Sequence, residues 1–331
     1  MHAIRQHEFG PPDTLVYESL PEPEPAAGQL RIAVHAAGVH LVDTVLRSGR
    51  YQGGFPVPAL PMIPGREVAG TVDAVGPGVD HGWVGRRVVA HLGWASGGYA
   101  ERAVAAADSV HQLPDGADPA AAVAMIGSGR TALAILDLAA VTSQDVVLVP
   151  SAAGGLGSLF VQAVRRAGGF VIGLAGGPEK VAVVDKIGAD AAIDYREPDW
   201  PDRVHTALAG RELSLVLDGV GAAVGRQSLE LLGIGGRQVI FGWSAGEPTR
   251  VETLDLQDRG LTVTALGPRL LHRPELLREL ESRAMAELAA GRLVPVVDSQ
   301  FPLAQAARAH AALESRATVG KTVLLPGLAV G

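Results

Sequence analysis

The first third of the chain alternates apolar and polar residues in short runs that end at glycine or proline. Residues 29–38 and 67–75 follow this period of two, and shorter runs occupy residues 87–91 and 99–104. Such alternation places successive side chains on opposite faces of a strand. Many short strands between turn residues predict a small antiparallel barrel or sandwich. Several prolines between residues 53 and 64 predict a surface loop near a site, because proline cannot donate to a sheet ladder.

From about residue 117 the pattern changes to alternating helices and strands. The helical patterns, with apolar residues three or four apart, cover residues 118–126, 131–140, 156–167, 178–187, 199–207 and 225–232. The strand patterns cover residues 146–149, 170–174, 191–193, 213–217, 238–241 and 261–266. This alternation predicts a parallel, doubly wound α/β sheet. The tail continues with helix 274–290, strand 293–297, helix 303–313 and strand 321–325.

Length and composition then restrict the class. A chain of 331 residues suggests two domains, and a net charge of −7 without a basic run argues against a nucleic-acid partner. The complete lack of cysteine excludes disulfides, thiolate metal sites and cysteine nucleophiles. The first ten residues lack the apolar core of a signal peptide, and no apolar run reaches the roughly 20 residues of a membrane span. We therefore expect a soluble cytoplasmic protein with no membrane partner.

The most specific local motif is the glycine-rich turn Ser151–Gly157, which follows strand 146–149 and precedes an apolar helix. Glycines in such a turn let backbone N–H groups approach a pyrophosphate at the helix N-terminus. Phe160 stands where a third glycine of the full dinucleotide motif would be, so a plain strand-to-helix turn is the alternative. The flanking strands favour a dinucleotide site.

The end of the second strand of this unit indicates which nicotinamide cofactor is bound. Residues 174–180 contain no acid at the strand end, where an NAD site usually places one for the ribose 2′-OH. Lys180 instead supplies a positive charge that suits a 2′-phosphate, although a solvated lysine at a helix start is the alternative. We therefore expect NADPH rather than NADH.

The order of the segments resembles the zinc-free quinone oxidoreductases of the medium-chain dehydrogenase/reductase superfamily, the group that includes zeta-crystallin. The resembling segments are residues 38–51, 64–65, 84–88, 97–101, 152–157, 188–190, 194–197, 218–221 and 314–321. The resemblance implies a GroES-like, β-rich catalytic domain from residues 1–122 and 268–331. It also implies a Rossmann NADP-binding domain from residues 123–267.

The resemblance further implies a set of cofactor-binding residues. They are Val42, Asp43, Thr131, Gly154, Gly155, Leu156, Gly176, Lys180, Tyr195, Phe241, Gly242, Trp243, Ser244, Leu266 and Lys321. Tyr195 would add a phenol donor to the 2′-phosphate, with a half-buried packing role as its alternative. Pairing of two copies of strand 261–266 is the usual dimer of the resembled family, and we expect a homodimer because an uncovered edge strand is a liability.

The chain departs from the resembled families at three places. Zinc-dependent relatives carry Gly-His-Glu where this chain has Gly65-Arg66-Glu67, and the histidines show no paired spacing for a metal, so we expect no zinc. His40 stands where quinone reductases usually have Asn; its imidazole could donate to a substrate, or it could be a structural histidine at a strand end. Val45 replaces a tyrosine that many relatives place there.

Two acceptor classes fit a bound nicotinamide. A quinone becomes a stabilised hydroquinone anion and requires no side-chain acid, whereas an enone or enoyl thioester leaves an enolate that benefits from a proton donor. The lack of an obvious acid favours an NADPH:quinone oxidoreductase, with the enone reductase as alternative. Catalytic candidates are His40, Tyr51 and Arg47; Arg47, Arg66 and Arg130 could each stabilise negative charge or form a structural ion pair.

A serine hydrolase is a competing interpretation because residues 242–246 fit G-x-S-x-G around Ser244, with Asp298 and His310 later in the chain. A nucleophile elbow must turn straight into a helix, but Pro248 follows the turn and residues 247–252 show no helical pattern. Ser244 is therefore expected to line the nicotinamide end of the cofactor site. A non-enzymatic cofactor-binding role is the third interpretation, since fold does not fix function.

Overall fold

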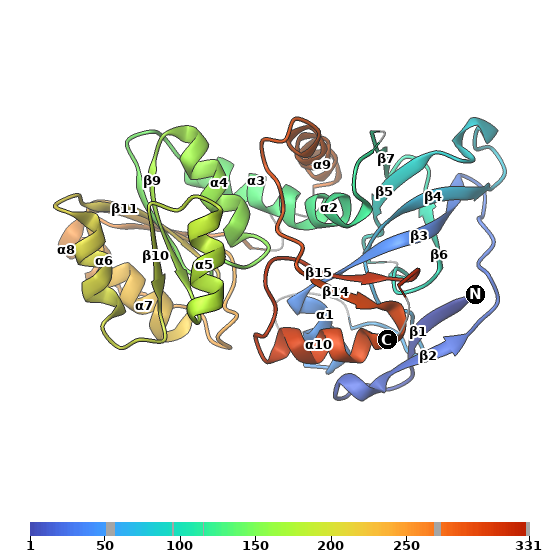
Figure 1. The fold of residues 1–331 in the computed structure, drawn as a ribbon, viewed down its shortest axis with the longest axis horizontal. Coiled ribbons are helices and arrows are strands. Elements are labelled where there is room, and N and C mark those ends of the chain that lie inside the picture. The colour runs from blue at the N-terminus through green and yellow to red at the C-terminus, as the bar shows by residue number, and fades with distance from the viewer. Residues whose placement is uncertain (51–56, 95, 115, 268–272, 329–331) are drawn as a thin grey trace. The chain divides into compact units, whose positions relative to one another are not determined.

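The computed structural model describes residues 1–331 except 51–56, 95, 115, 268–272 and 329–331. The chain divides into two compact units, residues 1–130 with 277–331 (unit 1) and residues 131–276 (unit 2). These units change over a few residues later than the predicted domain boundaries at 122/123 and 267/268, which stay predictions. Each unit is built around its own sheet (Figure 1).

Unit 1 contains a seven-stranded sheet in the order β14-β15-β3-β4-β5-β7, with β6 paired to β3, and a two-stranded sheet β1-β2. The neighbouring strands run antiparallel except β14 and β15, which are parallel. The strands are β1 (His2–Gln6), β2 (Leu15–Ser19), β3 (Gln29–Val39), β4 (Glu67–Val75), β5 (Arg87–His91), β6 (Arg102–Ala106), β7 (Val110–Gln112), β14 (Ser299–Pro302) and β15 (Thr322–Leu325).

The long central strand β3 supplies alternate residues to the apolar core of unit 1. Leu30, Ile32 and Val34, two residues apart, all point into one buried apolar cluster, as the alternation predicts. Helix α10 (Ala306–Glu314) buries Ala306 and Ala309 in the same cluster, so residues from the end of the chain complete a core begun near its start. Unit 1 also contains α1 (Leu41–Arg47) and most of α9 (Pro274–Ala289).

The two helices predicted at 118–126 and 131–140 form one continuous helical stretch, residues Pro119–Ala139. It consists of α2 (Pro119–Ala124), a π-helical turn (Met125–Gly129) and α3 (Arg130–Ala139). Its length and a mean hydropathy of 1.4 would allow a membrane span, contrary to the expectation that no segment is long enough. A buried core helix passes the same test; 61% of the apolar window is buried, and Val123 and Ile126 join a core cluster.

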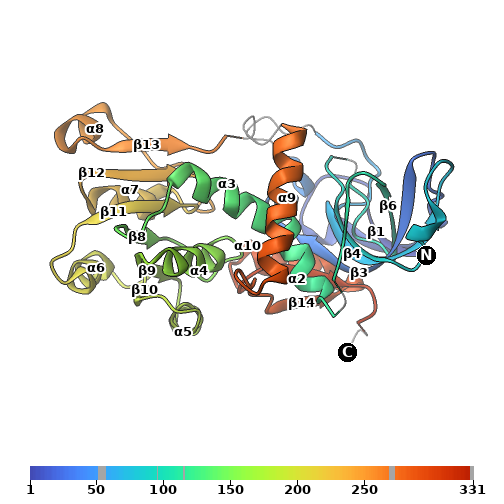
Figure 2. The same cartoon turned by 90° about the horizontal axis from the view of Figure 1, so that it is seen from above.

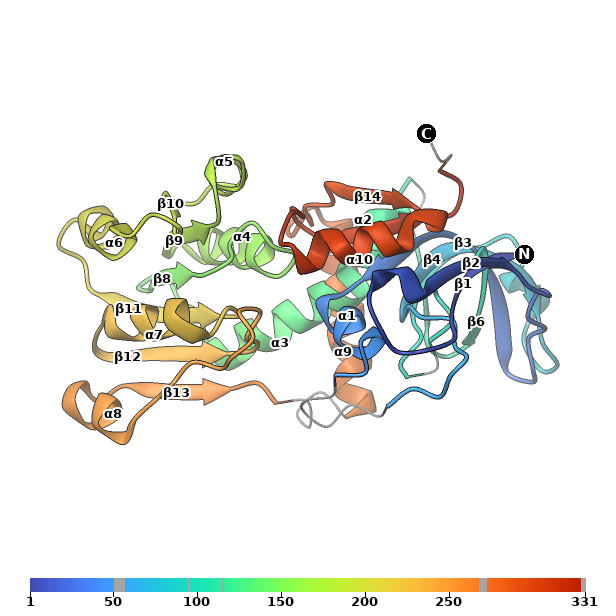
Figure 3. The same cartoon turned by 90° about the horizontal axis from the view of Figure 1, so that it is seen from below.

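Unit 2 contains a six-stranded parallel sheet in the order β10-β9-β8-β11-β12-β13. Figure 2 shows the strands side by side in this order, and Figure 3 shows the same order from the opposite side. The strands are β8 (Val146–Val149), β9 (Phe170–Ala175), β10 (Ala191–Asp194), β11 (Leu213–Asp218), β12 (Leu232–Ile240) and β13 (Thr262–Ala265). This is the Rossmann arrangement, in which strand order reverses beside the first strand, here β8.

Helices connect the parallel strands of unit 2. They are α4 (Gly157–Ala167), α5 (Pro178–Lys186), α6 (Trp200–Leu208), α7 (Ala222–Glu230) and α8 (Thr253–Arg259). The central strand β8 is buried along its whole length because helices cover parallel sheets on both faces. The expected α/β fold, a β-rich unit plus a doubly wound parallel sheet, is confirmed.

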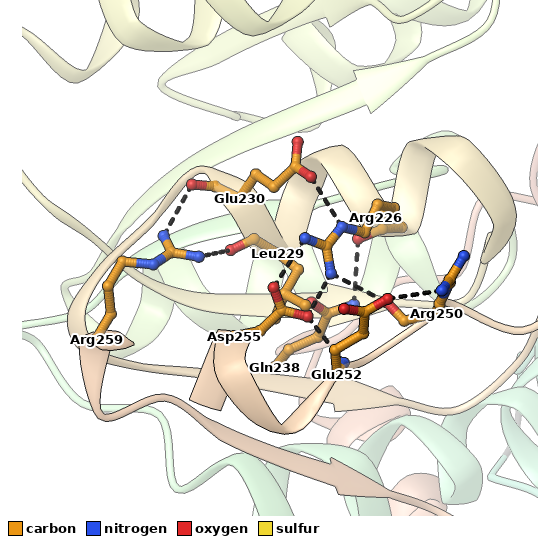
Figure 4. A network of polar contacts seen from close by, with 9 residues as sticks. Arg226, Leu229, Glu230, Gln238, Arg250, Glu252, Asp255 and Arg259 are labelled. Atoms are coloured by element: carbon orange, nitrogen blue, oxygen red, sulfur yellow. Dashed lines mark hydrogen bonds and ion pairs between the residues drawn. The ribbon is translucent and has the colours of Figure 1, made fainter. Parts of the chain in front are cut away.

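Helices α7 and α8 share a network of ion pairs (Figure 4), and their side chains Leu229 and Leu256 pack in the same apolar cluster. The guanidinium of Arg226 on α7 pairs with Glu230 and with both oxygens of Asp255 on α8. These hydrogen bonds lower the pKa of Asp255 to about 2. Arg259 donates to carbonyls of residues 229, 230 and 232, which lack partners at the end of α7.

Several predicted elements differ from the structure. The predicted strand 293–297 is wrong: it is irregular apart from a bridge between Val297 and Gly320, and the strand forms later, at β14. The run predicted as strand 99–104 pairs only from Arg102. The sequence reading missed β1, β2, β7, α1 and α8, short elements whose regular structure depends on tertiary pairing more than on local periodicity.

Candidate functional site

The glycine-rich turn of unit 2 lies between β8 and α4, at the point where the strand order reverses. Ser151 adopts a left-handed backbone conformation, and a side chain at Gly157 would overlap the Ser151 carbonyl, so only glycine allows this close approach. The amide of Ala152 donates to Leu174 at 2.7 Å and ties the turn to β9. The first amides of an α-helix have no intrahelical acceptor, and here they follow Gly154 and Gly155. The turn is therefore built to receive a phosphate group.

The turn after β9, Gly176 and Gly177, is in contact with the side chains of Tyr195 and Arg196, which follow β10. The hydroxyl of Tyr195 would be 2.9 Å from a Cβ at Gly176, and the guanidinium of Arg196 would overlap one at Gly177. Lys180 lies half-buried in the first turn of α5. The turn thus brings together one phenol and two cationic side chains, which is the chemistry that a phosphate monoester requires.

Asp194, the last residue of β10, holds Arg196 in place. Its carboxylate accepts from the backbone amide of Arg196 at 3.0 Å and pairs with the guanidinium at 3.3 Å. Burial raises the pKa of this carboxyl, but the hydrogen bonds from Arg196 and Gly177 lower it further than burial raises it. Arg196 was absent from the predicted site; the signal was the Asp194–Glu197 segment, where a cation directly follows Tyr195.

The segment after β12 forms a loop and no helix. Phe241 packs edge-on against Phe160 with ring centroids 5.3 Å apart, and the amide of Ser244 donates to Gly219 at 3.1 Å. Trp243 and Ser244 are exposed, and Leu266 is half-buried where its amide donates to Ile240. Helix α8 begins only at residue 253, so the backbone lacks the strand-to-helix geometry of a nucleophile elbow.

In the part of the chain that the structure describes, His310, the candidate histidine of a serine-hydrolase triad, also lacks the acid partner that a triad requires. His310 lies fully buried on α10, its Nε2 3.1 Å from the Tyr99 hydroxyl, and its Nδ1 has no hydrogen-bond partner within the described residues. Burial lowers the pKa of His310 to about 4. A triad histidine needs an acid on one nitrogen and a nucleophile on the other. Neither is found on His310, which argues against the serine hydrolase.

Three polar side chains from distant parts of unit 1 meet where β3 ends and β4 begins. His40 directly follows β3, Glu67 is the first residue of β4, and Lys321 precedes β15. Nζ of Lys321 lies 2.7 Å from His40 Nε2 and 2.8 Å from Glu67 Oε2. The same His40 nitrogen lies 2.5 Å from Glu67 Oε1. We call these three residues the His-Glu-Lys cluster.

Glu67 and Lys321 are buried, and their surroundings set the pKa of each. Burial raises the pKa of the Glu67 carboxyl, but the positive charges of His40 and Lys321 hold it well below its usual value. Burial lowers the pKa of the Lys321 ammonium, and Glu67 partly offsets this. His91, opposite Glu67 on β5, has a pKa well below the usual value because of burial and the nearby Arg130.

A second polar group surrounds Asp43 on α1. Its Oδ2 accepts from the His40 amide at 2.8 Å and from the Tyr99 hydroxyl at 3.2 Å, and Arg66 lies 3.5 Å from Oδ1. Burial and Asp43 raise the pKa of Tyr99 well above its usual value. Unit 1 therefore brings the predicted residues His40, Asp43 and Lys321 into one neighbourhood; Glu67 and Tyr99 belong to it but were not predicted.

The remaining candidates lie apart from the His-Glu-Lys cluster or outside the described residues. Arg47 is buried and pairs with Glu314, and Arg130 pairs with Glu281, which favours a structural ion-pair role for both. Val42 is half-buried on α1, and Thr131 is half-buried on α3. Tyr51 lies outside the described residues. The site list stays a prediction.

Comparisons with known proteins are consistent with this architecture. A family model described as alcohol dehydrogenase GroES-like domain matches residues 26–115, and one described as zinc-binding dehydrogenase matches residues 187–324. A GroES-like unit joined to a Rossmann sheet defines the medium-chain dehydrogenase/reductase superfamily.

Individual relatives give the family. The chain is 34% identical to a quinone oxidoreductase from Sus scrofa over 98% of both proteins. It superimposes on the Escherichia coli quinone oxidoreductase complexed with NADPH with a TM-score of 0.86, 32% identity and coverage of 98% and 100%. It also resembles a 2-haloacrylate reductase, with a TM-score of 0.78, 30% identity and coverage of 99% and 100%. The chain belongs to the quinone oxidoreductase family of this superfamily, and the expected resemblance is confirmed.

Proposed function

We propose that this protein is an NADPH-dependent oxidoreductase that passes a hydride to a quinone. The observation that carries the proposal is the turn after β9. Tyr195 and Arg196 lie against its two glycines, Lys180 follows them in the first turn of α5, and the carboxylate of Asp194 is already paired with Arg196. The NADPH-bound Escherichia coli relative supports the same cofactor.

The residues present fit NADPH. The β8–α4 turn offers helix-end amides to the pyrophosphate, and the β9–α5 turn offers cationic and phenolic donors to the 2′-phosphate. Glycines at 176 and 177 leave room that a Cβ would fill. When bound, the cofactor supplies the hydride, so this chain's own task is to bind, orient and exclude water.

A quinone suits the acceptor site because its reduced form is a stabilised anion, to which a proton can be added after the hydride. Val45 replaces the tyrosine expected in many relatives, and several relatives that match nearly the whole chain are called quinone oxidoreductases. The likeness to a 2-haloacrylate reductase favours a second candidate acceptor, an activated carbon–carbon double bond.

The proposal includes catalysis without zinc. The chain has no cysteine, and the described residues hold no group of three histidines or acids placed to bind a metal. An ammonium group, that of Lys321, already lies between His40 and Glu67, where a metal would need their lone pairs. Metal analysis of the purified protein tests this part: zinc in stoichiometric amount, with activity lost on chelation, would contradict it.

We also propose a homodimer formed through β13. This half-exposed strand is the last in the sheet order, so one edge has no strand partner among the described residues of unit 2. A monomer mass by light scattering at micromolar concentration would contradict it. The cytoplasmic location stays a prediction.

Titration of both cofactors tests the central proposal. Wild type should bind NADPH at least tenfold more tightly than NADH, and Lys180→Ala should reduce this preference, since a charge-assisted contact contributes about 1.5–3 kcal/mol. Turnover is then measured with NADPH and 9,10-phenanthrenequinone, 1,4-benzoquinone and crotonyl-CoA as acceptors. Equal affinity for the two cofactors, or no turnover with any acceptor, would refute the proposal.

A further inference from the structure

One nitrogen in the His-Glu-Lys cluster faces both a proton donor and a proton acceptor. His40 Nε2 is 2.7 Å from the Lys321 ammonium and 2.5 Å from Glu67 Oε1. An imidazole nitrogen carries either a proton or a lone pair, so it can donate to Glu67 or accept from Lys321, but not both. The contact distances thus allow two proton placements that exchange by one transfer from Nζ to Nε2.

The surroundings of Glu67 favour the placement in which Nε2 carries a proton. Oε1 makes no other hydrogen bond within the described residues, and a buried carboxylate oxygen is costly without a donor. A side chain at Gly127 would overlap Oε1, and one at Gly38 would overlap Oε2. The two glycines let the backbone close against the carboxylate and leave His40 and Lys321 as its partners. Gly127 lies in the π-helical turn, a feature frequent at functional sites.

Of the three side chains in the cluster, that of His40 is the most exposed to solvent. The Glu67 side chain is 0% exposed and that of Lys321 4%, whereas that of His40 is 23% exposed. A proton that leaves the buried pair toward solvent or a ligand therefore passes through the imidazole ring. Nδ1, the ring nitrogen that contacts neither Lys321 nor Glu67, is the atom from which that proton would leave.

We propose that His40 is the proton donor of this enzyme and that Lys321, held by Glu67, returns the proton to it. The inference rests on the proposed function, because it needs an acceptor that becomes an anion. After hydride transfer, Lys321 Nζ passes a proton to His40 Nε2, and the oxygen of the reduced quinone takes the proton of Nδ1. An O–H bond forms at the quinone and an N–H bond at Nε2, N–H bonds break at Nδ1 and Nζ, and Lys321 remains a neutral amine until solvent protonates it.

Charged neighbours support this order of transfer. Glu67 faces His40, Lys321 and His91, and Lys321 faces Glu67, Asp43 and Arg66. Burial weakens the hold of Lys321 on its proton, while the neighbouring cations keep Glu67 ionised, so the amine and not the carboxylate supplies the proton. His40→Asn, the residue usual in quinone reductases, keeps a polar group and removes the relay.

The test measures kcat with NADPH and 9,10-phenanthrenequinone between about pH 5 and 9, in water and in deuterium oxide. Three variants are compared with wild type: His40→Asn, the charge-neutral double variant Glu67→Gln with Lys321→Met, and Lys180→Ala as matched control. We expect a solvent isotope effect and a pH inflection in wild type. His40→Asn should lose both and lower kcat by about 100-fold, the lower end for a general acid.

The double variant should keep a folded protein, since neither charge is left unpaired, but its pH inflection should move. Lys180→Ala should change NADPH affinity and leave the pH profile and solvent isotope effect as in wild type. An unchanged profile and isotope effect in His40→Asn would overturn the relay alone. Wild type without turnover for any acceptor would refute the proposed function and the relay with it.

A measurement without substrate gives an independent readout. Nitrogen-15 NMR of the His40 ring reports which nitrogen carries the proton. The relay predicts that the tautomer changes with pH in wild type and does so differently in the double variant. One fixed tautomer over the whole range would overturn the proposal.

Discussion

The two units hold their charged groups in opposite ways. Unit 1 buries Glu67, Lys321, Asp43 and His310, whereas unit 2 carries Arg196 as a 58% exposed side chain at the end of its sheet. When one charge of a buried pair is removed, the other is left with neither a partner nor water, which lowers stability. When an exposed cation is removed, water solvates the groups it contacted, and stability changes little. Chemistry in unit 1 is therefore coupled to stability, and cofactor affinity in unit 2 can be changed nearly independently of it.

Loss of a single charge from the cluster should have the largest effect. Lys321→Met leaves the fully buried Glu67 carboxylate without its ammonium partner, and breaking a buried ion pair in this way costs about 3–5 kcal/mol. Hydrogen exchange followed by mass spectrometry should show faster exchange in β3, β4 and β15, with little change in unit 2.

The double variant Glu67→Gln with Lys321→Met is the control for that experiment. It removes both charges, so it should recover most of the lost protection, because neutral replacement of a buried pair is often tolerated. Equal loss in the single and double variants would mean that shape, and not charge, is what the cluster contributes.

The second largest effect is expected from acid, which should lower the stability of unit 1 more than that of unit 2. Burial lowers the pKa of His310 to about 4 and also lowers those of His35 and His91, all three in unit 1. The unfolded chain binds protons below its own pKa of 6.5, so unit 1 loses stability as pH falls from about 6.5 to 4. For His310 alone the full loss is about 3 kcal/mol.

In unit 2 the corresponding group is Asp145, whose pKa is lowered because hydrogen bonds from Arg237 and Ser214 outweigh its burial. Its contribution is present above 3.8 and is lost only below that value, so unit 2 should resist mild acid. Hydrogen exchange at pH 7 and 5 checks both units in one experiment, and His310→Gln should flatten the response of unit 1. A larger acid effect in unit 2 would reverse the comparison.

The smallest effect is expected for Arg196→Ala. NADPH affinity should fall by about threefold to tenfold, since an exposed charge-assisted contact is screened by water, and the urea midpoint should not move. Calorimetric titration with NADPH and NADH measures the change. The control is Arg166→Ala in the last turn of α4, an exposed arginine of the same unit. A loss that is equal for NADH would show that Arg196 does not act on the 2′-phosphate.

The elements of unit 2 could be predicted well because the local spacing of apolar residues indicates each helix and strand. The strands at 146–149 and 213–217 and the helix at 156–167 match the structure within a residue or so at each end. Parallel strands buried on both faces produce continuous apolar runs, and the helices between them have their own period. Unit 1 was less readable, since its short strands form only when distant partners pair.

The candidate site divides in the same way. Lys180 was predicted from its place after the second strand of the unit and Tyr195 from the family resemblance, whereas Arg196 was missed although it follows Tyr195 directly. Glu67 was quoted only as part of a zinc-relative motif, since no local pattern shows that a carboxylate will be buried against two glycines. The partnership of His40 with Lys321 depends on a pairing of strands from opposite ends of the chain.

The discontinuity of unit 1 also has a consequence for how the protein is made. Lys321 is synthesised 254 residues after Glu67, and the whole of unit 2 lies between them in the chain. The ribosome therefore completes the strands of unit 2 before it synthesises Lys321, the partner of Glu67, and β15, the partner of β3. A nascent chain that stops before Lys321 retains an unpaired carboxylate in an open sheet, so unit 1 can close only after its last strand has been synthesised.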